Sequence, residues 1–390
     1  MNPEWERLLS LIPGPLDWKI DWDLWHGLWL WPYFEQMAKT QQNPCWHGEG
    51  DVWSHTRMVC EELVSMNRFR KLPKRQRQEV FLAAVLHDIG KIPCTRWEDG
   101  CLISPNHTVV GARMAREMLR VTYGLGGTRD RLEFRETVCS LIRYHSVPAH
   151  ILDQEDPERR IFQIASNGEL AADFTVELLC ILEEADVRGR IYQNVEQSVD
   201  MVRLCAEFAR ELSCLDRPFR FPSDYARYAY LSGRKISPGQ ELYDDTWGKV
   251  ILMAGLPGTG KDTWIQRNCS GLPVVSLDEI RKELHISPLE PQGEVAQRAR
   301  EKAKEYLRKK QPFVWNATSL TSSLREKQIR LFHNYGASVH IVYLETAWEE
   351  QLARNQNRSD PVPELAIQKM QKNLVLPELY EAEKVSWLNV

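Results

Sequence analysis

The sequence predicts a helical domain followed by an α/β domain, and three observations carry this prediction. At 390 residues, the chain is longer than one ordinary domain. Apolar residues recur at helical spacing through the first 230 residues, whereas short β-rich runs alternate with helical segments beyond residue 247. A glycine-rich loop follows the first of those β-rich runs directly. We therefore expect an all-α domain and then an α/β domain with a parallel sheet.

The composition is that of a globular protein, with 43% apolar residues, 27% charged residues and a formal net charge of −4. The nine cysteines form no C-x-x-C pair, which argues against a disulfide framework and against a structural zinc site. The first residues lack a basic segment followed by an apolar run, and no stretch reaches the ~18 apolar residues of a membrane span. We expect a cytoplasmic protein with no membrane partner, and the sequence leaves its oligomeric state open.

The helices expected in the first domain carry apolar residues three and four positions apart. They lie in Glu79–Leu86, Val109–Leu119, Thr137–Tyr144, Glu177–Ala185 and Val199–Leu212. Eight of the fourteen tryptophans precede Ser54. Such rings can stack on unpaired bases, although packing inside the protein is the commoner use of tryptophan.

The strands expected in the second domain alternate with helices, as in a parallel sheet. They lie in Val250–Ala254, Pro273–Leu277, Pro312–Trp315 and Ser338–Leu344. Ahead of them, turn-forming residues cluster between Arg220 and Trp247. We therefore place the helical domain at residues 1–230, a linker at 231–247 and the α/β domain at 248–390.

The glycine-rich loop has the G-x-x-x-x-G-K pattern of a phosphate loop and stands between a strand and a helix, as that motif requires. Glycines let backbone N–H groups turn toward phosphates, and the lysine reaches the β- and γ-phosphates of a nucleotide. The pattern predicts that ATP or another NTP binds at Gly255, Gly258, Thr259, Gly260, Lys261, Asp262 and Thr263.

Asp262 departs from the usual pattern, because the residue after the lysine is normally a serine or threonine whose hydroxyl binds Mg²⁺. A carboxylate is also a hard oxygen ligand, so Asp262 is the candidate for binding Mg²⁺ directly or through water. Thr263 is rotated around the helix and is the poorer candidate. The departure leaves the metal geometry open, but not the phosphate site.

Charged residues follow the later strands of this domain. We expect Asp278 at the end of the second strand, where it can take a proton from an attacking hydroxyl, with Arg281 one turn later to hold a phosphate. An N-cap aspartate with a surface arginine is an equally good interpretation. Arg354 and Arg358 precede a proline-marked loop and resemble the helical lid of small P-loop kinases, with a solvated basic helix face as the alternative.

The order of these motifs resembles that of the 5′-hydroxyl polynucleotide kinases of bacterial and phage RNA repair. The resemblance covers about residues 248–370 and includes Asn316-Ala317-Thr318 after the third strand. It implies a role for each matching residue: phosphate binding by Lys261, proton abstraction by Asp278, a hold on the acceptor's 3′ phosphate by Arg281, and contact with the donor phosphates by Arg354 or Arg358.

Histidine and aspartate residues of the helical domain form a second pattern. His87-Asp88 closes an apolar helical run, with His55 upstream and Asp186 downstream. Imidazole and carboxylate together suit a divalent transition metal. The ordered set resembles the H…HD…D signature of the HD superfamily, which implies that these four residues bind a metal.

Three further histidines are weaker candidates. Residues placed like His107 and His145 complete the site in HD proteins that hold a second metal or use a histidine to bind phosphate. A helix-end histidine hydrogen-bonded to the backbone is the alternative for both. His47, just before Glu49, is weaker again.

The metal indicates the reaction. A divalent ion lowers the pKa of bound water and polarises a phosphoryl oxygen, so we expect phosphoester hydrolysis. Imidazole ligands favour Mn²⁺, Co²⁺ or Ni²⁺ over Mg²⁺, whereas the oxygen ligands of the second domain suit Mg²⁺.

The whole chain, in this domain order, resembles the bifunctional bacterial HD-domain phosphohydrolase–polynucleotide kinase family. The resemblance implies phosphorylation of a 5′-OH end and removal of a 2′,3′-cyclic, 2′- or 3′-phosphate. RNA or DNA ends are then the substrates, and a polynucleotide ligase acts downstream. Two alternatives stay open: an HD nucleotidase fused to a nucleoside or metabolite kinase, and a nucleotide-gated regulatory protein.

Overall fold

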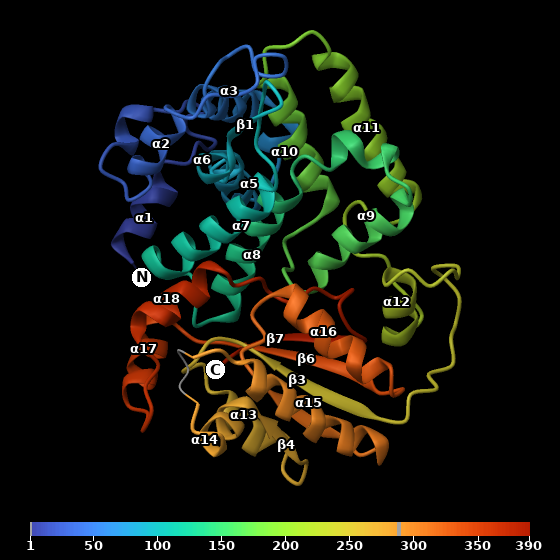
Figure 1. Ribbon diagram of the computed structural model, residues 1–390. Coiled ribbons are helices and arrows are strands. Elements are labelled where there is room, and N and C mark those ends of the chain that lie inside the picture. Colours follow the sequence, from blue (N-terminus) through green and yellow to red (C-terminus); the bar gives the residue numbers. More distant parts are fainter. Residues whose placement is uncertain (1, 287–289) are drawn as a thin grey trace. The chain divides into compact units, whose positions relative to one another are not determined.

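The computed structural model describes residues 2–286 and 290–390. The chain separates into two compact units, one containing the residues up to Leu125 together with Asp130–Phe219, the other Gly126–Arg129 and Arg220–Val390. The first unit is helical and the second contains a parallel sheet with helices, which confirms the predicted fold class (Figure 1). Within the described residues, no helix is long and apolar enough to cross a membrane.

The first unit consists of helices and a short antiparallel hairpin that the sequence analysis did not predict. Its α-helices are α1 (Pro3–Ser10), α2 (Trp31–Met37), α3 (Val52–Ser65), α4 (Asn67–Arg70), α5 (Lys74–Leu86), α6 (Lys91–Cys94), α7 (His107–Glu117), α8 (Arg129–Tyr144), α9 (Pro157–Ala165), α10 (Val176–Arg188) and α11 (Val195–Glu211). Short 3-10 and π segments are η1 (Trp22–Trp25), η2 (Met118–Thr122), η3 (Pro148–Asp153) and η4 (Ser166–Glu169), and the hairpin is β1 (Arg96–Glu98) and β2 (Cys101–Ile103). The predicted helical runs lie in α5, α7 with η2, α8, α10 and α11.

Helix α10 lies at the centre of this unit and packs against α3, α5 and α11. The Thr175 side chain caps its first turn by accepting a hydrogen bond from the Leu178 N–H. Nearly every residue of α10 is buried, including Asp186. A helix buried on all faces is a core element, so a carboxylate on it must be compensated by neighbouring side chains or a cation.

Most of the tryptophan-rich opening serves packing. Trp25 is fully buried, and the Trp53 ring stacks on Phe34 with ring centroids 4.3 Å apart. Trp29 and Trp46 are the exceptions, with 64% and 56% of their surface exposed. Trp29 and Trp46 therefore remain candidates for stacking on bases, whereas most of the other rings pack inside the protein.

The second unit is built on a parallel five-stranded sheet in the order β4-β5-β3-β6-β7. The strands are β3 (Lys249–Ala254), β4 (Val274–Ser276), β5 (Phe313–Asn316), β6 (Ser338–Glu345) and β7 (Lys384–Asn389). The helices are α12 (Asp224–Leu231), α13 (Lys261–Asn268), α14 (Leu277–Glu283), α15 (Gly293–Arg308), α16 (Ser322–His333), α17 (Trp348–Gln356) and α18 (Glu364–Lys372). The four predicted strands are confirmed, and β7 is an edge strand that was not predicted.

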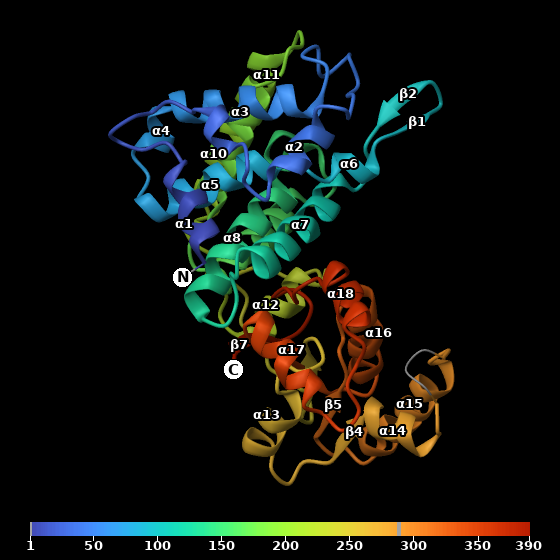
Figure 2. The ribbon, with the colours of Figure 1, turned by 90° about the vertical axis from the view of Figure 1, so that its left-hand side faces the viewer.

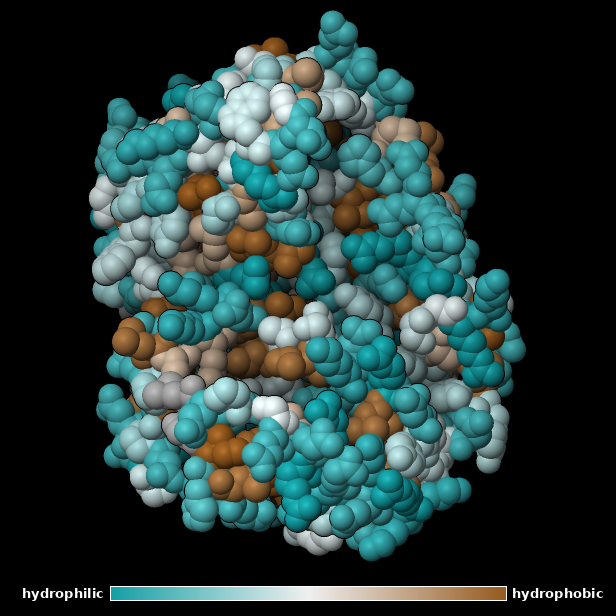
Figure 3. Space-filling model, in the orientation of Figure 1, coloured by the Kyte–Doolittle hydropathy of each residue, from teal (hydrophilic) through white to brown (hydrophobic). Residues whose placement is uncertain are grey.

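Helices cover both faces of this sheet. Figure 2 shows α15 and α16 on one side of the sheet and α13 on the other. Crossovers between parallel strands are right-handed. The connections from β4 to β5 and from β5 to β6 run in the same direction across the sheet, so their helices lie on the same face. The surface visible in Figure 3 is largely hydrophilic, and hydrophobic side chains appear on it in separate patches.

Asp278 lies one element later than the sequence analysis placed it. Strand β4 ends at Ser276, whose hydroxyl accepts a hydrogen bond from the Glu279 N–H and caps α14. Asp278 is therefore in the first turn of α14, where a negative charge also interacts favourably with the helix dipole. It still stands at the carboxyl edge of the sheet, beside the phosphate loop that follows β3.

Candidate active sites

Four predicted metal ligands of the first unit come together inside it. His55 is on α3, His87 and Asp88 directly follow α5, and Asp186 is on α10; all four are buried. His55 Nε2 lies 2.9 Å from Asp186 Oδ1 and 3.3 Å from His87 Nε2. His87 Nε2 lies 3.3 Å from Asp88 Oδ2. Residues up to 131 positions apart thus present nitrogen and oxygen atoms to one small space.

The carboxylate of Asp88 faces two groups of histidines, one with each oxygen. Its Oδ2 atom faces His55 and His87. Its Oδ1 atom lies 3.4 Å from His107 Nε2 and 3.9 Å from His145 Nε2, and it accepts no hydrogen bond within the described residues. A buried carboxylate oxygen without a hydrogen-bond partner, facing imidazole nitrogens, is what a bound cation would satisfy.

Three of the histidines are fixed to the backbone in the same way. The Nδ1 atoms of His87, His107 and His145 each lie 2.8 Å from the carbonyl oxygen three residues earlier. A carbonyl only accepts, so each Nδ1 carries the hydrogen and each neutral ring keeps its Nε2 lone pair for a metal. For His107 and His145, the helix-end interpretation and the ligand interpretation are therefore compatible, because each uses a different nitrogen.

The electrostatics keep His107 and His145 neutral and Asp88 ionised, as a metal needs. At His55, burial lowers the pKa, but the hydrogen bonds to Asp186 and Glu49 raise it overall. Burial lowers the pKa of His145 to about 3 and also lowers the pKa of His107, so both rings are neutral at pH 7. Burial would raise the pKa of Asp88, but Lys91 and His87 together lower it well below its usual range. Neutral imidazoles with ionised carboxylates fit a divalent transition metal.

Lys91 belongs to this site, although the sequence analysis gave it no role. Its Nζ atom lies 2.6 Å from Asp88 Oδ2 and 2.6 Å from the Gln42 side-chain oxygen. The side chain is buried, so its charge is largely unscreened by water. Its position three residues after Asp88, in the first turn of α6, is the feature of the sequence that could have indicated this contact.

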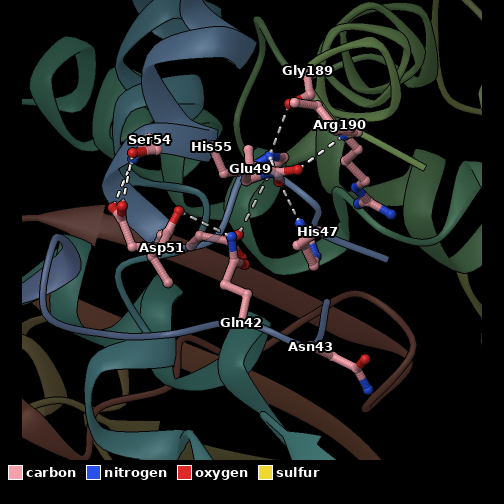
Figure 4. A network of polar contacts seen from close by, with 12 residues as sticks. Gln42, Asn43, His47, Glu49, Asp51, Ser54, His55, Gly189 and Arg190 are labelled. Carbon is pink, nitrogen blue, oxygen red and sulfur yellow. Dashed lines mark hydrogen bonds and ion pairs between the residues drawn. The ribbon is translucent and has the colours of Figure 1, made fainter. Parts of the chain in front are cut away.

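Glu49 is a second residue that the sequence analysis missed, and Figure 4 shows it between His47 and His55. Its Oε1 atom lies 2.7 Å from His47 Nδ1 and 3.0 Å from His55 Nδ1, and its Oε2 atom accepts a hydrogen bond from the Ile191 N–H. Despite burial, these hydrogen bonds lower the pKa of Glu49. A carboxylate on Nδ1 fixes the ring so that Nε2 faces the site and raises the basicity of that nitrogen.

Asp186 is held from its other side by Arg190. An Arg190 guanidinium nitrogen lies 2.5 Å from Asp186 Oδ2, whereas Asp186 Oδ1 faces His55. Although burial alone would raise the pKa of Asp186, Arg190 and His55 lower it well below its usual range. Glu49, Lys91 and Arg190 thus support the predicted ligands without being part of the predicted set.

In the second unit, the phosphate loop has the left-handed backbone that its glycines allow. Gly255, Gly258 and Gly260 have φ values of 136°, 84° and 82°. A Cβ atom on Gly258 would lie 2.6 Å from the Gln351 carbonyl oxygen, so this position has no room for a side chain. The Lys261 Nζ atom donates hydrogen bonds of 2.9 Å to the carbonyls of Gly255 and Leu256, which places it inside the loop.

Asp262 and Thr263 are both exposed on the first turn of α13 and line the same open cavity. The Asp262 Oδ1 atom accepts a hydrogen bond of 2.7 Å from the side-chain amide of Asn316, the last residue of β5. The amide orients the carboxylate and leaves its second oxygen for a ligand. Asp262 thus fits the Mg²⁺ role better than Thr263, for which no such orienting contact is seen in the described residues.

Asp278 lies among arginines from two elements. A guanidinium nitrogen of Arg281 lies 2.5 Å from Asp278 Oδ1, and one of Arg358 lies 3.4 Å from Asp278 Oδ2. Burial raises the pKa of Asp278, but Arg281, Lys261 and Arg358 together lower it. The carboxylate is therefore ionised at neutral pH and can accept a proton.

The two lid arginines differ in what they contact. Arg358 reaches Asp278, whereas Arg354 pairs with Glu350 one turn earlier on α17, at 2.5 Å. Both line an open cavity of about 1100 Å³ that also contains the phosphate loop, Asp278 and Arg281. Arg358 thus lies beside the acceptor residue Asp278, whereas an Arg354 guanidinium nitrogen lies 3.5 Å from where a Cβ atom on Gly260 of the phosphate loop would stand.

Comparison with known protein families assigns each unit. Residues 52–181 match the family described as HD domain, and residues 250–377 match the family described as AAA domain. The chain is an HD domain fused to a P-loop kinase-like domain. The first match spans His55, His87 and Asp88 and ends before Asp186. An HD domain implies a divalent metal, and the phosphate loop implies a nucleotide with Mg²⁺.

The Glu49 carboxylate should tune metal affinity in the HD domain. Replacing it in Glu49→Gln removes the charge behind His55, and loss of such a contact typically weakens metal binding about 10–100-fold. Metal affinity is measured by competition with a chromogenic chelator. Glu61→Gln is the matched control, because Glu61 is an exposed carboxylate on α3, the helix that carries His55. Unchanged affinity in Glu49→Gln would show that the contact does not act on the metal.

Nucleotide binding in the kinase-like domain should weaken in alkaline solution. Burial lowers the pKa of Lys261 to about 8, so its amine is charged below that pH and loses its proton above it. Phosphates bind the charged form, and we expect ATP affinity at constant Mg²⁺ to fall by up to about tenfold per pH unit above pH 8. Calorimetry from about pH 6 to about pH 10 measures this. Lys261→Ala should bind weakly without this dependence; the same decline in that variant would assign it to another group.

Proposed function

We propose that this protein heals broken RNA ends. The P-loop domain transfers a phosphoryl group from ATP to a 5′-OH end, and the HD domain removes a 2′,3′-cyclic, 2′- or 3′-phosphate. One observation carries the proposal: a proton acceptor flanked by arginines beside the phosphate loop, Asp278 with Arg281, shares a chain with the histidine–aspartate cluster around Asp88.

In the kinase domain, the protein's own groups position and deprotonate the acceptor. Lys261 and the loop N–H groups bind the donor phosphates, and Mg²⁺ when bound neutralises further charge. Asp278 accepts the proton of the 5′-hydroxyl as its oxygen attacks the γ-phosphorus and the bond to the β-phosphate oxygen breaks. Arg281 holds the phosphate on the 3′ side of the acceptor nucleotide. Arg354 or Arg358 stabilises the charge on the transferring group.

In the HD domain, a divalent metal held by His55, His87, Asp88 and Asp186 would supply an activated water and polarise the phosphoryl group. Histidines fixed at Nδ1 keep their Nε2 atoms directed at that centre. Lys91, buried beside Asp88, provides a positive charge for an incoming phosphate. Arg190 balances Asp186, so a dianionic phosphate end enters a site that is not excessively negative.

The two activities form a coherent pair. Cleavage of RNA through its 2′-OH leaves a 2′,3′-cyclic phosphate on one side and a 5′-OH on the other. Both ends must be remade before a ligase can join them. Each domain of this chain would remake one of them, and a polynucleotide ligase would consume both products.

A single substrate tests both halves. Purified protein is incubated with labelled RNA carrying a 5′-OH and a 2′,3′-cyclic phosphate, with ATP, Mg²⁺ and Mn²⁺, Co²⁺ or Ni²⁺. Lys261→Ala should lose 5′ phosphorylation and keep hydrolysis. Asp88→Asn should lose bound metal and hydrolysis and keep phosphorylation, because the two sites share no residue. Activity on free nucleosides or nucleotides, with none on RNA, would favour the small-molecule alternative.

Asp278→Asn should reduce the kcat of phosphorylation by about 10²–10⁴-fold, the usual contribution of a general base. ATP affinity should change little, since Asp278 faces the acceptor. Glu279→Gln, the exposed neighbour on α14, is the control and should behave as the wild type. Near-normal turnover in Asp278→Asn would assign the residue a structural role.

A further inference from the structure

The kinase cavity extends beyond the residues that the transfer reaction needs. From Arg281 it follows α15. Gln292, the N-cap residue of that helix, accepts a hydrogen bond of 2.8 Å from Arg281 Nε, and Ala296 and Arg300 follow at intervals of four. Residues four apart lie on one side of a helix. At 1.5 Å per residue, this wall extends about 12 Å from the acceptor pair.

Helix α16 forms the opposite wall. Leu324, Lys327 and Leu331 line the cavity at intervals of three and four, so one stripe of this helix faces it. Leu324 is 47% exposed despite being apolar. Both helices lie on the same side of the sheet (Figure 2). The space between them is a groove that continues from the acceptor side of the transfer site.

Two cations of this groove form no ion pair within the described part of the chain. Arg300 and Lys327 are exposed, and no ion pair or hydrogen bond of either is seen among residues 2–286 and 290–390, although the charge of Arg300 interacts with that of the neighbouring Glu301. By contrast, Arg281, Arg354 and Arg358, closer to the transfer site, all contact carboxylates. Unpaired cations beside apolar side chains match a single nucleic-acid strand, whose phosphates are anionic and whose bases are apolar on their faces.

We propose that this groove binds the acceptor strand beyond its first nucleotide, with Arg300 and Lys327 holding the next backbone phosphate. This inference rests on the proposed kinase function and adds to it a second phosphate subsite formed by two named residues. A nucleoside 3′-monophosphate has one phosphate, which Arg281 takes, and it leaves the two groove cations without a ligand. The donor nucleoside does not occupy the groove, because in-line transfer places donor and acceptor on opposite sides of the γ-phosphate.

The test compares 5′ phosphorylation of a nucleoside 3′-monophosphate with that of short RNA oligonucleotides of increasing length. For the wild type, kcat/KM should rise once a second phosphate is present. The variant Arg300→Ala/Lys327→Ala should lose about tenfold or more in kcat/KM on a hexanucleotide, mainly through KM. It should stay within about twofold of the wild type on the mononucleotide. Its dependence on salt should be shallower by about one to two phosphate contacts.

The matched control is Arg298→Ala/Arg330→Ala, which removes exposed cations of α15 and α16 that do not line the cavity. Equal losses on the mononucleotide and the oligonucleotide, or a loss in the control as large as in the groove variant, would overturn the inference. So would wild-type kinetics that do not depend on strand length. If the wild-type protein phosphorylates no RNA at all, the proposed function itself fails.

Discussion

Burial of the Asp88 carboxylate is the constraint on which the helical unit depends. An ionised group can be removed from water only if other charges and hydrogen-bond donors replace its hydration. Here five helices meet around one carboxylate, and each contributes part of that replacement: imidazoles at the ends of α5, α7 and α8, another from within α3, and an ammonium from α6. The same donor set that makes the buried charge tolerable is also a candidate cation site, so the packing of the unit and its expected chemistry have one origin.

The α/β unit solves the opposite problem with different means. Three of its features favour the binding of anions. They are the edge where the parallel strands end, a glycine-rich loop whose backbone can approach a phosphate closely, and the first turn of a helix. Side chains serve mainly to place charge: Lys261 lies inside the loop, and Asp278 lies beside Arg281 and Arg358. The two halves of the proposed reaction thus rely on side-chain ligands in one unit and on backbone geometry in the other.

The sequence predicts what is encoded within short motifs and much less of what is assembled from loops. The phosphate loop is identifiable because its strand–loop–helix motif fixes its geometry locally. The His87-Asp88 pair is identifiable only together with His55 and Asp186, as an ordered set that resembles the HD signature. Glu49 was not, since it lies in a segment without periodicity and meets His55 only through the fold. Asp278 was assigned to a strand end because serine is common in loops as well as at helix N-caps. Ser276 therefore did not show that α14 begins directly after it. The edge strand β7 is half-buried at several positions and lacks a strong apolar run, so periodicity did not indicate it.

Two histidines of the candidate metal site also terminate helices. His87 and His145 stand just past the last residues of α5 and α8, and their Nδ1–H groups satisfy carbonyls of the final turns, which have no partner within the helix. Each ring therefore caps the end of its helix and also presents its Nε2 atom to the candidate metal site. A ligand mounted in this way cannot swing aside without fraying the helix that carries it, so loading of the ion and rigidity of the helix ends are thermodynamically linked. A bound ion would hold together helices that are far apart in the chain.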